Sequence, residues 1–445
     1  MTPTDDLFRL IKSLTKSEKR YFKLFSGLQK GNKKYVSLFR AIERQESYDE
    51  NKLKILFSDK TFTNQLSVSK IHLFNLLLKS LSLYHSDRTS DFRIREALNS
   101  IEVLFYKGMF EQCLKMIKKQ KIIARKAEKC NLLLELLRWE RRLLSFDIDN
   151  LYLLHNSWLE TSAIRKMAAR SDEYQQTNLT FWMRFNEKGK TREKEDVSEF
   201  HNLFMSLPDE PVDGGWESRW YFWNTHLNYY RATGNYSNAF SAAVNALRTL
   251  ETVPDLTGEE PHKYITSLSN IAVVLQELGE LEECKYYTNK LRNFVTQKNL
   301  SFYSQICSRA FILSDNTELE ICIRSGLIEE ALVLVPLIEE YIEEPFNFTS
   351  EYSKLGIYLE ITYLFFIAEN YKNALFWINK VLARPSIRSD IQPVARLMNI
   401  LIHYELGNLH TLESVIVSAT NFLRTKNRFY EYENSMNMKK RFFAN

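Results

Sequence analysis

Residues 223–250 read WNTHLNYYRATGNYSNAFSAAVNALRTL, which is two helix-forming stretches joined at Gly234. The first stretch places large apolar side chains about one helical turn apart, and the second carries Ala239, Ala243 and Ala246 at a similar spacing. Glycine allows the backbone of a tight turn, and alanine lets two helices approach each other closely. The segment therefore predicts a pair of closely packed helices.

Similar turns recur along the chain, each followed by an aromatic or aliphatic residue and usually by a small residue three positions further on. They occur in YKGMFEQC, ELGELEEC, RSGLIEEA, IAENYKNA and ELGNLHTL, near residues 108, 279, 326, 369 and 407. Spacing alone adds turns near residue 148 and at Gly189. Because neighbouring turns lie 38–47 residues apart, residues 91–425 are expected to form about eight stacked helix pairs.

The helix-pair pattern resembles the tetratricopeptide repeat. The residues that match this repeat at its own spacing are Trp223, Leu227, Tyr230, Gly234, Tyr236, Ala239 and Ala246. The units in this chain are longer than the family's usual length of about 34 residues. The resemblance implies an all-α fold in which the helix pairs form a right-handed α-solenoid with a concave groove.

In that family the first helix of each pair lines the groove, so the resemblance also implies which residues contact a partner. These are Tyr221, Asn224, Asn228 and Arg231 in the best-matching pair, with Asn270 and Asn316 nearby in the next two first helices. Amide side chains can hydrogen-bond a peptide backbone, and arginine can pair with a carboxylate. The alternative is a polar face that solvent merely wets. Trp216, Trp220 and Trp223 also offer aromatic surfaces, although helical spacing predicts that Trp223 is a core residue.

The two ends of the chain have a different character. Residues 1–90 contain short amphipathic helices, including one that begins with a capping box of Thr15 and Glu18, and a long apolar helix near residues 67–84. This region is expected to form a small helical bundle. Residues 426–445 are expected to form a capping helix followed by a tail.

Positive charge is concentrated near the N-terminus. Residues 1–130 carry 27 Lys and Arg against 14 Asp and Glu, whereas residues 131–445 carry 33 against 41. The clustered cations are candidates for contact with a phosphate backbone: Lys16, Lys19, Arg20, Lys23, Lys115, Lys118, Lys119, Lys121, Arg125 and Lys126. The alternative is a solvated helix surface, on which lysine is common.

No catalytic, cofactor-binding or metal-binding motif is evident. Gly189, Lys190 and Thr191 spell the end of a phosphate-binding loop, but Arg184 stands where that loop needs a second glycine. The eight histidines are dispersed without metal-ligand spacing. The five cysteines contain no C-x-x-C pair, which favours reduced core thiols. We therefore expect binding rather than an enzyme activity, and no cofactor.

These patterns lead to two hypotheses about function. The N-terminus has no signal-peptide pattern and no apolar run long enough for a membrane span, so a cytoplasmic protein without membrane contact is expected. The first hypothesis is a scaffold that binds a protein or peptide partner in the concave groove. The second, less favoured, is a nucleic-acid-associated regulator with a basic N-terminal region and a ligand-sensing repeat region. No oligomeric state is predicted.

Overall fold

The computed structural model describes residues 6–27, 33–57, 65–146, 148–188, 194–205, 207, 210–211, 215–297, 304–343, 349–385 and 391–425. Every regular element in these ranges is a helix, so the predicted all-α fold is confirmed. None of the described helices combines the length and apolar character needed to cross a membrane. The expected capping helix of residues 426–445 and the turn at Gly189, with its neighbours Lys190 and Thr191, lie outside the described residues.

The first helices of the chain pack together around an apolar core of their own. They are α1 (Asp6–Ser13), α2 (Lys16–Gly27), α3 (Lys33–Glu43), α4 (Glu50–Leu56) and α6 (Leu66–Tyr84). Their core includes Ile11, Phe22, Leu38, Leu53 and Leu77. The predicted capping box is confirmed at the start of α2, where the Thr15 N–H donates to Glu18 Oε2 at 2.7 Å and the Glu18 N–H donates to Thr15 Oγ1 at 3.2 Å.

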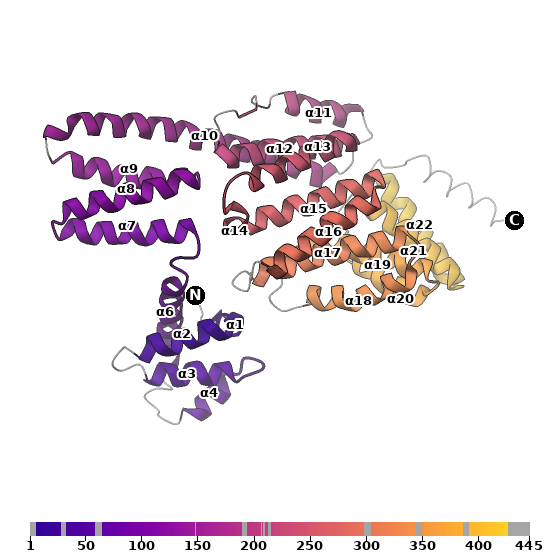
Figure 1. Cartoon of the computed structure of the whole chain (residues 1–445). Helices are drawn as coiled ribbons and strands as arrows, with labels where there is room; N and C mark the ends of the chain where they lie inside the picture. The colour runs from indigo at the N-terminus through magenta and orange to yellow at the C-terminus, as the bar shows by residue number, and fades with distance from the viewer. Residues whose placement is uncertain are drawn as a thin grey trace.

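From residue 90 onward, the helices pack mainly against their neighbours in sequence (Figure 1). The pairs are α7 (Ser90–Tyr106) with α8 (Phe110–Lys126), α9 (Cys130–Leu144) with α10 (Leu151–Lys188), α12 (Gly215–Ala232) with α13 (Tyr236–Glu251), α15 (Pro261–Leu278) with α16 (Leu281–Gln297), α17 (Ser304–Arg324) with α18 (Ile328–Glu343), α19 (Glu351–Ile367) with α20 (Tyr371–Leu382), and α21 (Gln392–Glu405) with α22 (Leu409–Thr425). This arrangement is compatible with a helical repeat.

One long helix, α10, connects two parts of the array: the helices α7 to α9 before it and the helices from α12 onward. α10 has 38 residues and packs against both α9 and α12. The predicted turn near residue 148 is where the chain passes from α9 through the short helix η1 (Ile148–Asn150) into α10. α11 (Lys194–Met205) packs against α12, and the short α14 (Leu256–Glu259) precedes α15. In Figure 1, α7 to α10 therefore form a layer at the left and α12 to α22 continue at the right.

The predicted turns share one geometry. At Gly234 φ is +75°, the Gly234 N–H donates to the Arg231 carbonyl at 3.3 Å, and the Asn235 N–H donates to the Tyr230 carbonyl at 2.8 Å. These two bonds satisfy carbonyls at the end of α12 that lack a partner within the helix. The same pair of bonds forms at Gly108, Gly279, Gly326, Glu369 and Gly407, so these predicted turns are confirmed.

The close packing predicted for residues 223–250 is also confirmed. Ala239, Ala243 and Ala246 of α13 are almost completely buried, in one core with residues of α12, α15 and α16. Trp223 is partly buried and packs against this core, as its helical spacing predicts. Trp216 and Trp220 are only 3% and 8% exposed, so neither presents an open ring face to a ligand.

Candidate interaction surfaces

The residues predicted to line a groove on α12 differ in accessibility. Tyr221, Asn228 and Arg231 are half-buried, whereas Asn224 is 5% exposed. The Asn224 amide Nδ2 donates to the Trp220 carbonyl of the same helix at 2.8 Å. The Asn224 side chain is therefore hydrogen-bonded inside the protein, whereas Tyr221, Asn228 and Arg231 stay partly accessible.

Asn224 belongs to a row of amides that crosses successive first helices. Asn270 of α15 donates from Nδ2 to Asn224 Oδ1 at 3.3 Å, so the structure brings these two predicted residues together. Asn316 occupies the corresponding region of α17, where its Oδ1 is buried without a hydrogen-bond partner among the described residues. Because amides that bond to each other fix neighbouring helices, the row contributes to packing between pairs.

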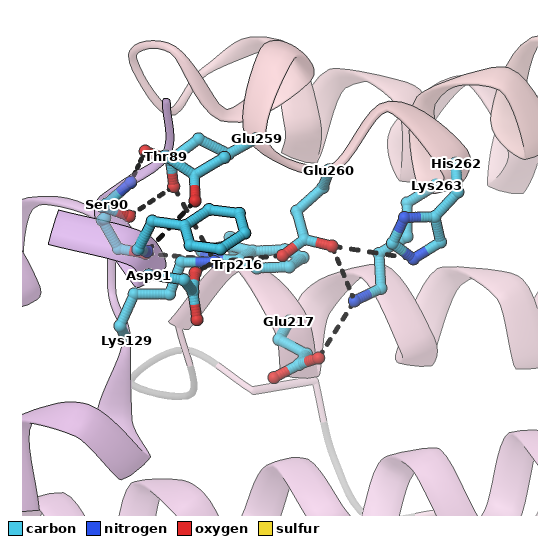
Figure 2. A network of polar contacts seen from close by, with 12 residues as sticks. Thr89, Ser90, Asp91, Lys129, Trp216, Glu217, Glu259, Glu260, His262 and Lys263 are labelled. Carbon is cyan, nitrogen blue, oxygen red and sulfur yellow. Dashed lines mark hydrogen bonds and ion pairs between the residues drawn. The ribbon is translucent and has the colours of Figure 1, made fainter. Parts of the chain in front are cut away.

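A second polar cluster joins the two parts of the array, where α7, α9 and α15 begin (Figure 2). Lys129, immediately before α9, has a side chain only 11% exposed. Its Nζ lies 2.5 Å from Asp91 Oδ2, 3.0 Å from Glu260 Oε1 and 3.7 Å from Glu259 Oε2. Ser90 adds two bonds to Glu259, from its N–H at 3.0 Å and from its hydroxyl at 2.5 Å. These contacts tie α7 and α9 to the start of α15.

Glu260 connects the largely covered Lys129 to the buried Lys263. The Nζ of Lys263 lies 3.6 Å from Glu260 Oε2 and 3.1 Å from Glu217 Oε1, which belongs to α12. The same ammonium lies 4.8 Å from the centre of the Trp216 ring, within range of a cation–π contact. Figure 2 shows the resulting chain of alternating charges running from α7 to α12. We call this set of contacts the junction network.

Beside the junction network, Glu128 anchors the start of α12. It forms the turn between α8 and α9 with φ at +52°, and its carboxylate accepts the Trp216 N–H at the start of α12, where negative charge is favoured. Gly215 has φ at +72°, a left-handed conformation that favours glycine, and the ends of the Met167 and Glu128 side chains lie close to where a Cβ would stand. A polar pocket of about 220 Å³ lies next to these residues.

The junction network holds its charges in fixed states. Burial alone lowers the pKa of Lys129, but the hydrogen bond to Asp91 and the charge of Glu260 outweigh it and hold that pKa above its ordinary value. Burial raises the pKa of Glu260, but Lys263 and Lys129 outweigh it and hold that pKa below its ordinary value. A protonated lysine is no nucleophile, and an ionised glutamate is no general acid. The geometry therefore suits a structural role, in which these ion pairs hold α7, α9, α12 and α15 together.

Within the described ranges, no three His, Cys, Asp or Glu side chains are arranged to hold a metal ion.

A groove crosses α8, α9 and α10, with a volume of about 500 Å³. Its lining includes Lys121, whose side chain is 9% exposed and whose Nζ lies 2.8 Å from Glu140 Oε2 and 2.9 Å from Glu160 Oε2. Arg125 Nε donates to Glu160 Oε1 at 2.9 Å, and the Ser157 hydroxyl donates to Glu140 Oε2 at 2.9 Å. Two predicted phosphate contacts, Lys121 and Arg125, are therefore paired with carboxylates of this chain.

The rest of this α8–α10 groove is largely apolar and open. Ile122 of α8 is 60% exposed and Leu153 of α10 is 53% exposed, with Leu114 and Leu144 completing the apolar lining. Lys118 also lines the groove, is exposed, and forms no ion pair with any described residue. An exposed apolar area bordered by polar groups is typical of a surface that binds another protein.

The other predicted phosphate contacts occupy two places. Lys16, Lys19, Arg20 and Lys23 line one pocket of about 380 Å³ with Leu24 and Glu43, which we call the α2 pocket. The remaining cations are on α8, where Lys115 lies 4.0 Å from Glu111 and where Lys119 and Lys126 are exposed. The structure thus brings four of the ten residues together on the N-terminal bundle and leaves the others on α8.

Sequence reasoning missed the junction network. Apart from Asp91 of α7, its carboxylates come from two segments that stand out in the sequence only as loops containing Pro and Gly, residues 206–217 and 252–262. These segments supply Glu217, Glu259 and Glu260, whereas Lys129 comes from a turn far earlier in the chain. The loops were a usable signal, because connections that carry function are often irregular.

Comparison of the chain with known protein families, with curated proteins and with solved structures gives no match. The surfaces themselves therefore carry the functional inference.

Proposed function

We propose that this protein is an interaction scaffold that binds an amphipathic helix of a partner protein in the α8–α10 groove. The observation that carries the proposal is the composition of that groove. Exposed Ile122 and Leu153 stand beside Lys118, which has no ion-pair partner in the described part of the chain, in a volume of about 500 Å³. Burying such side chains contributes about 25 cal/mol per Å² of apolar surface removed from water.

A helix fits this groove better than an extended strand. Leu114, Lys118, Ile122 and Arg125 follow one another at roughly one-turn intervals along α8, which gives a ridge of the kind that packs against another helix. Among the described residues, no unpaired backbone edge is present to receive a strand, because all regular structure is helical. An incoming helix therefore offers the matching surface.

The charge of α8 defines the polar side of the partner. Lys115, Lys118, Lys119 and Lys126 are exposed on this helix, and Glu111 is the exposed carboxylate near them. Opposite charges across an interface speed association and exclude partners of the same sign. We infer that the bound helix carries Asp or Glu beside its apolar stripe.

The proposed architecture of the scaffold follows from the repeat pattern. We infer a tetratricopeptide-like, right-handed solenoid whose first helices face a concave side. Tyr221, Asn228 and Arg231 are half-buried on the first helix α12 and form a second contact area in this proposal. Asn224 and Asn270 do not belong to that contact area but join α12 to α15 behind it, through the hydrogen bond between their amides.

We also propose a cytoplasmic location, which the cysteines support. All five cysteines are free thiols, and Cys113, Cys284 and Cys322 are buried. Burial raises the pKa of Cys284 to about 11, so its thiol is unreactive at neutral pH. Free thiols persist in reducing compartments, whereas exported proteins usually oxidise theirs.

The proposal is tested by selecting binders from a display library of amphipathic helical peptides, with the full-length protein as bait. We expect enriched peptides to combine an apolar stripe with acidic residues. The double variant I122E/L153E, which places two carboxylates in the groove, should weaken those peptides by at least about a hundredfold. Fluorescence anisotropy gives the dissociation constants.

A matched control separates the groove from the rest of the array. Val333 and Phe376 are 69% and 53% exposed on α18 and α20, away from the groove residues. The variant V333E/F376E should leave peptide binding unchanged. The groove assignment is wrong when both double variants weaken binding equally, or when no acidic amphipathic peptide is enriched.

A further inference from the structure

The α2 pocket collects positive charge that the fold does not neutralise. Its lining consists of Lys16, Lys19, Arg20, Lys23 and Leu24 from α2 and Glu43 from the end of α3. Four cations thus face one carboxylate in a volume of about 380 Å³.

Glu43 pairs with two of the four pocket cations, and its own backbone carbonyl binds Lys12 from outside the pocket lining. Lys19 Nζ lies 3.5 Å from Glu43 Oε1, and Lys23 Nζ lies 3.2 Å from Glu43 Oε2. Lys12 of α1 donates from Nζ to the Glu43 carbonyl at 3.0 Å. Because one carboxylate serves two ammonium groups, an incoming anion can take over part of their coordination.

The remaining two cations have no such partner. Lys16 and Arg20 are exposed, and neither forms an ion pair with a residue that the structure describes. They lie one turn apart at the beginning of α2, so both side chains reach the same pocket. A guanidinium group next to an ammonium group is a common arrangement for recognising phosphate oxygens.

The position of these cations on α2 does not serve helix stability. Lys16 is the first residue of α2, and the N-terminal end of a helix repels positive charge and attracts anions. The acid that would normally offset this charge, Glu18, points inward. It is 5% exposed, caps the helix with Thr15, and lies 2.7 Å from the Nε2 of buried His85. The outer surface of α2 is therefore left positive.

We propose that the α2 pocket binds a phosphate-bearing anion. Lys16 and Arg20 contact its oxygens first, and Lys19 and Lys23 shift from Glu43 to the bound group. This binding is independent of helix recognition in the α8–α10 groove, since the two sites lie on different helices. Two sources share the chemistry, a small polyphosphate and the backbone of a nucleic acid.

Two probes distinguish these sources with the full-length protein. Tripolyphosphate is titrated by calorimetry, and a labelled thymidine single strand of about 12 nucleotides is titrated by fluorescence anisotropy. Both titrations are run at about 50 mM salt and repeated at about 200 mM, because contacts to phosphate weaken with salt. We expect K16Q/R20Q to weaken the bound probe at least about tenfold.

A variant that strengthens binding distinguishes loss of the site from loss of folding. Replacing the competing carboxylate, Glu43→Gln, should strengthen binding about threefold or more, which a merely unfolded variant would not do. The matched control is K115Q/K119Q, which removes two exposed cations of α8 outside the pocket. It should leave the affinity for tripolyphosphate unchanged.

Binding of tripolyphosphate that K16Q/R20Q weakens and E43Q strengthens supports a small polyphosphate site. The same variant pattern with the oligonucleotide alone supports a nucleic-acid backbone. The proposal is overturned when neither probe binds at low salt, when K115Q/K119Q weakens binding as much as K16Q/R20Q, or when E43Q has no effect.

Discussion

The α12–α13 pair and the α8–α10 groove are built from similar helices, yet one is closed and the other is open. Between α12 and α13, small side chains such as Ala239 and Ala243 are buried and leave no room for a ligand. In the groove, the buried Lys121 of α8 pairs with the half-buried Glu140 of α9, and apolar residues at the edges stay exposed. Side-chain size at the helix contacts thus decides which parts of the array are core and which are surface.

The largest expected effect is a loss of stability when the α12–α13 contact is overpacked. Ala243→Leu adds three carbons to a position that is 1% exposed, and overpacking of this kind destabilises a fold by about 3 kcal/mol. Urea unfolding followed by circular dichroism measures the change in the free energy of unfolding. Ala169→Leu is the control, because Ala169 is exposed on α10 and should change that free energy by less than about 0.5 kcal/mol. Equal tolerance of both substitutions would contradict the close approach of α12 and α13.

The closed region is also the part that the sequence predicts best. A turn at Gly234 and alanines one helical turn apart are local signals, because both are read within a few residues. The turn at Glu369 was found from its flanking pattern, although glutamate rarely adopts its φ of +55°. Glu128 adopts the same left-handed conformation without any such pattern, so the turn between α8 and α9 was not predicted.

The second prediction concerns the open region. Lys121→Met leaves Glu140 and Glu160 close together without the ammonium that both contact. Removing one partner from a buried ion pair leaves uncompensated charge, and here we expect a loss of about 2 kcal/mol, because both carboxylates are partly solvated. Urea unfolding at neutral pH provides the measurement. A variant as stable as the parent protein would show that this ion cluster does not support the groove.

Lowering the pH below 4.5 should reduce the difference in the free energy of unfolding between Lys121→Met and the parent protein. Burial raises the pKa of Glu160, but Lys121 and Arg125 outweigh it and hold that pKa below its ordinary value of 4.5. The ionised carboxylate therefore stabilises the folded state above pH 4.5, and this contribution disappears as the pH falls through the lowered pKa. Without Lys121 less of this contribution exists, so the stability of the variant should fall less steeply below pH 4.5.

The open region also shows why part of the site escapes sequence reasoning. The sequence shows a run of lysines on α8, but it does not show that Glu140 and Glu160 fold beside Lys121. The same holds at the junction network, where Lys129 meets Glu259 across more than a hundred residues of chain. Ion pairing between distant segments depends on how helices stack, and no local pattern encodes it. Cations of the α2 pocket were found because they lie on one short helix.

The smallest expected effect tests whether the amide row supports the fold or contacts a partner. Asn270→Ala removes the amide that donates to Asn224 Oδ1, and because Asn224 is buried, an unsatisfied acceptor should lower the free energy of unfolding by about 1 kcal/mol. Asn228→Ala is the matched control, since Asn228 is half-buried and forms no hydrogen bond recorded among the described residues. Its substitution should leave stability within about 0.5 kcal/mol of the parent protein. The reverse ranking would place Asn270 on the accessible face and return it to the set of partner contacts. The expected ranking assigns Asn224 and Asn270 to packing and keeps the half-buried Tyr221, Asn228 and Arg231 as the proposed contacts on α12.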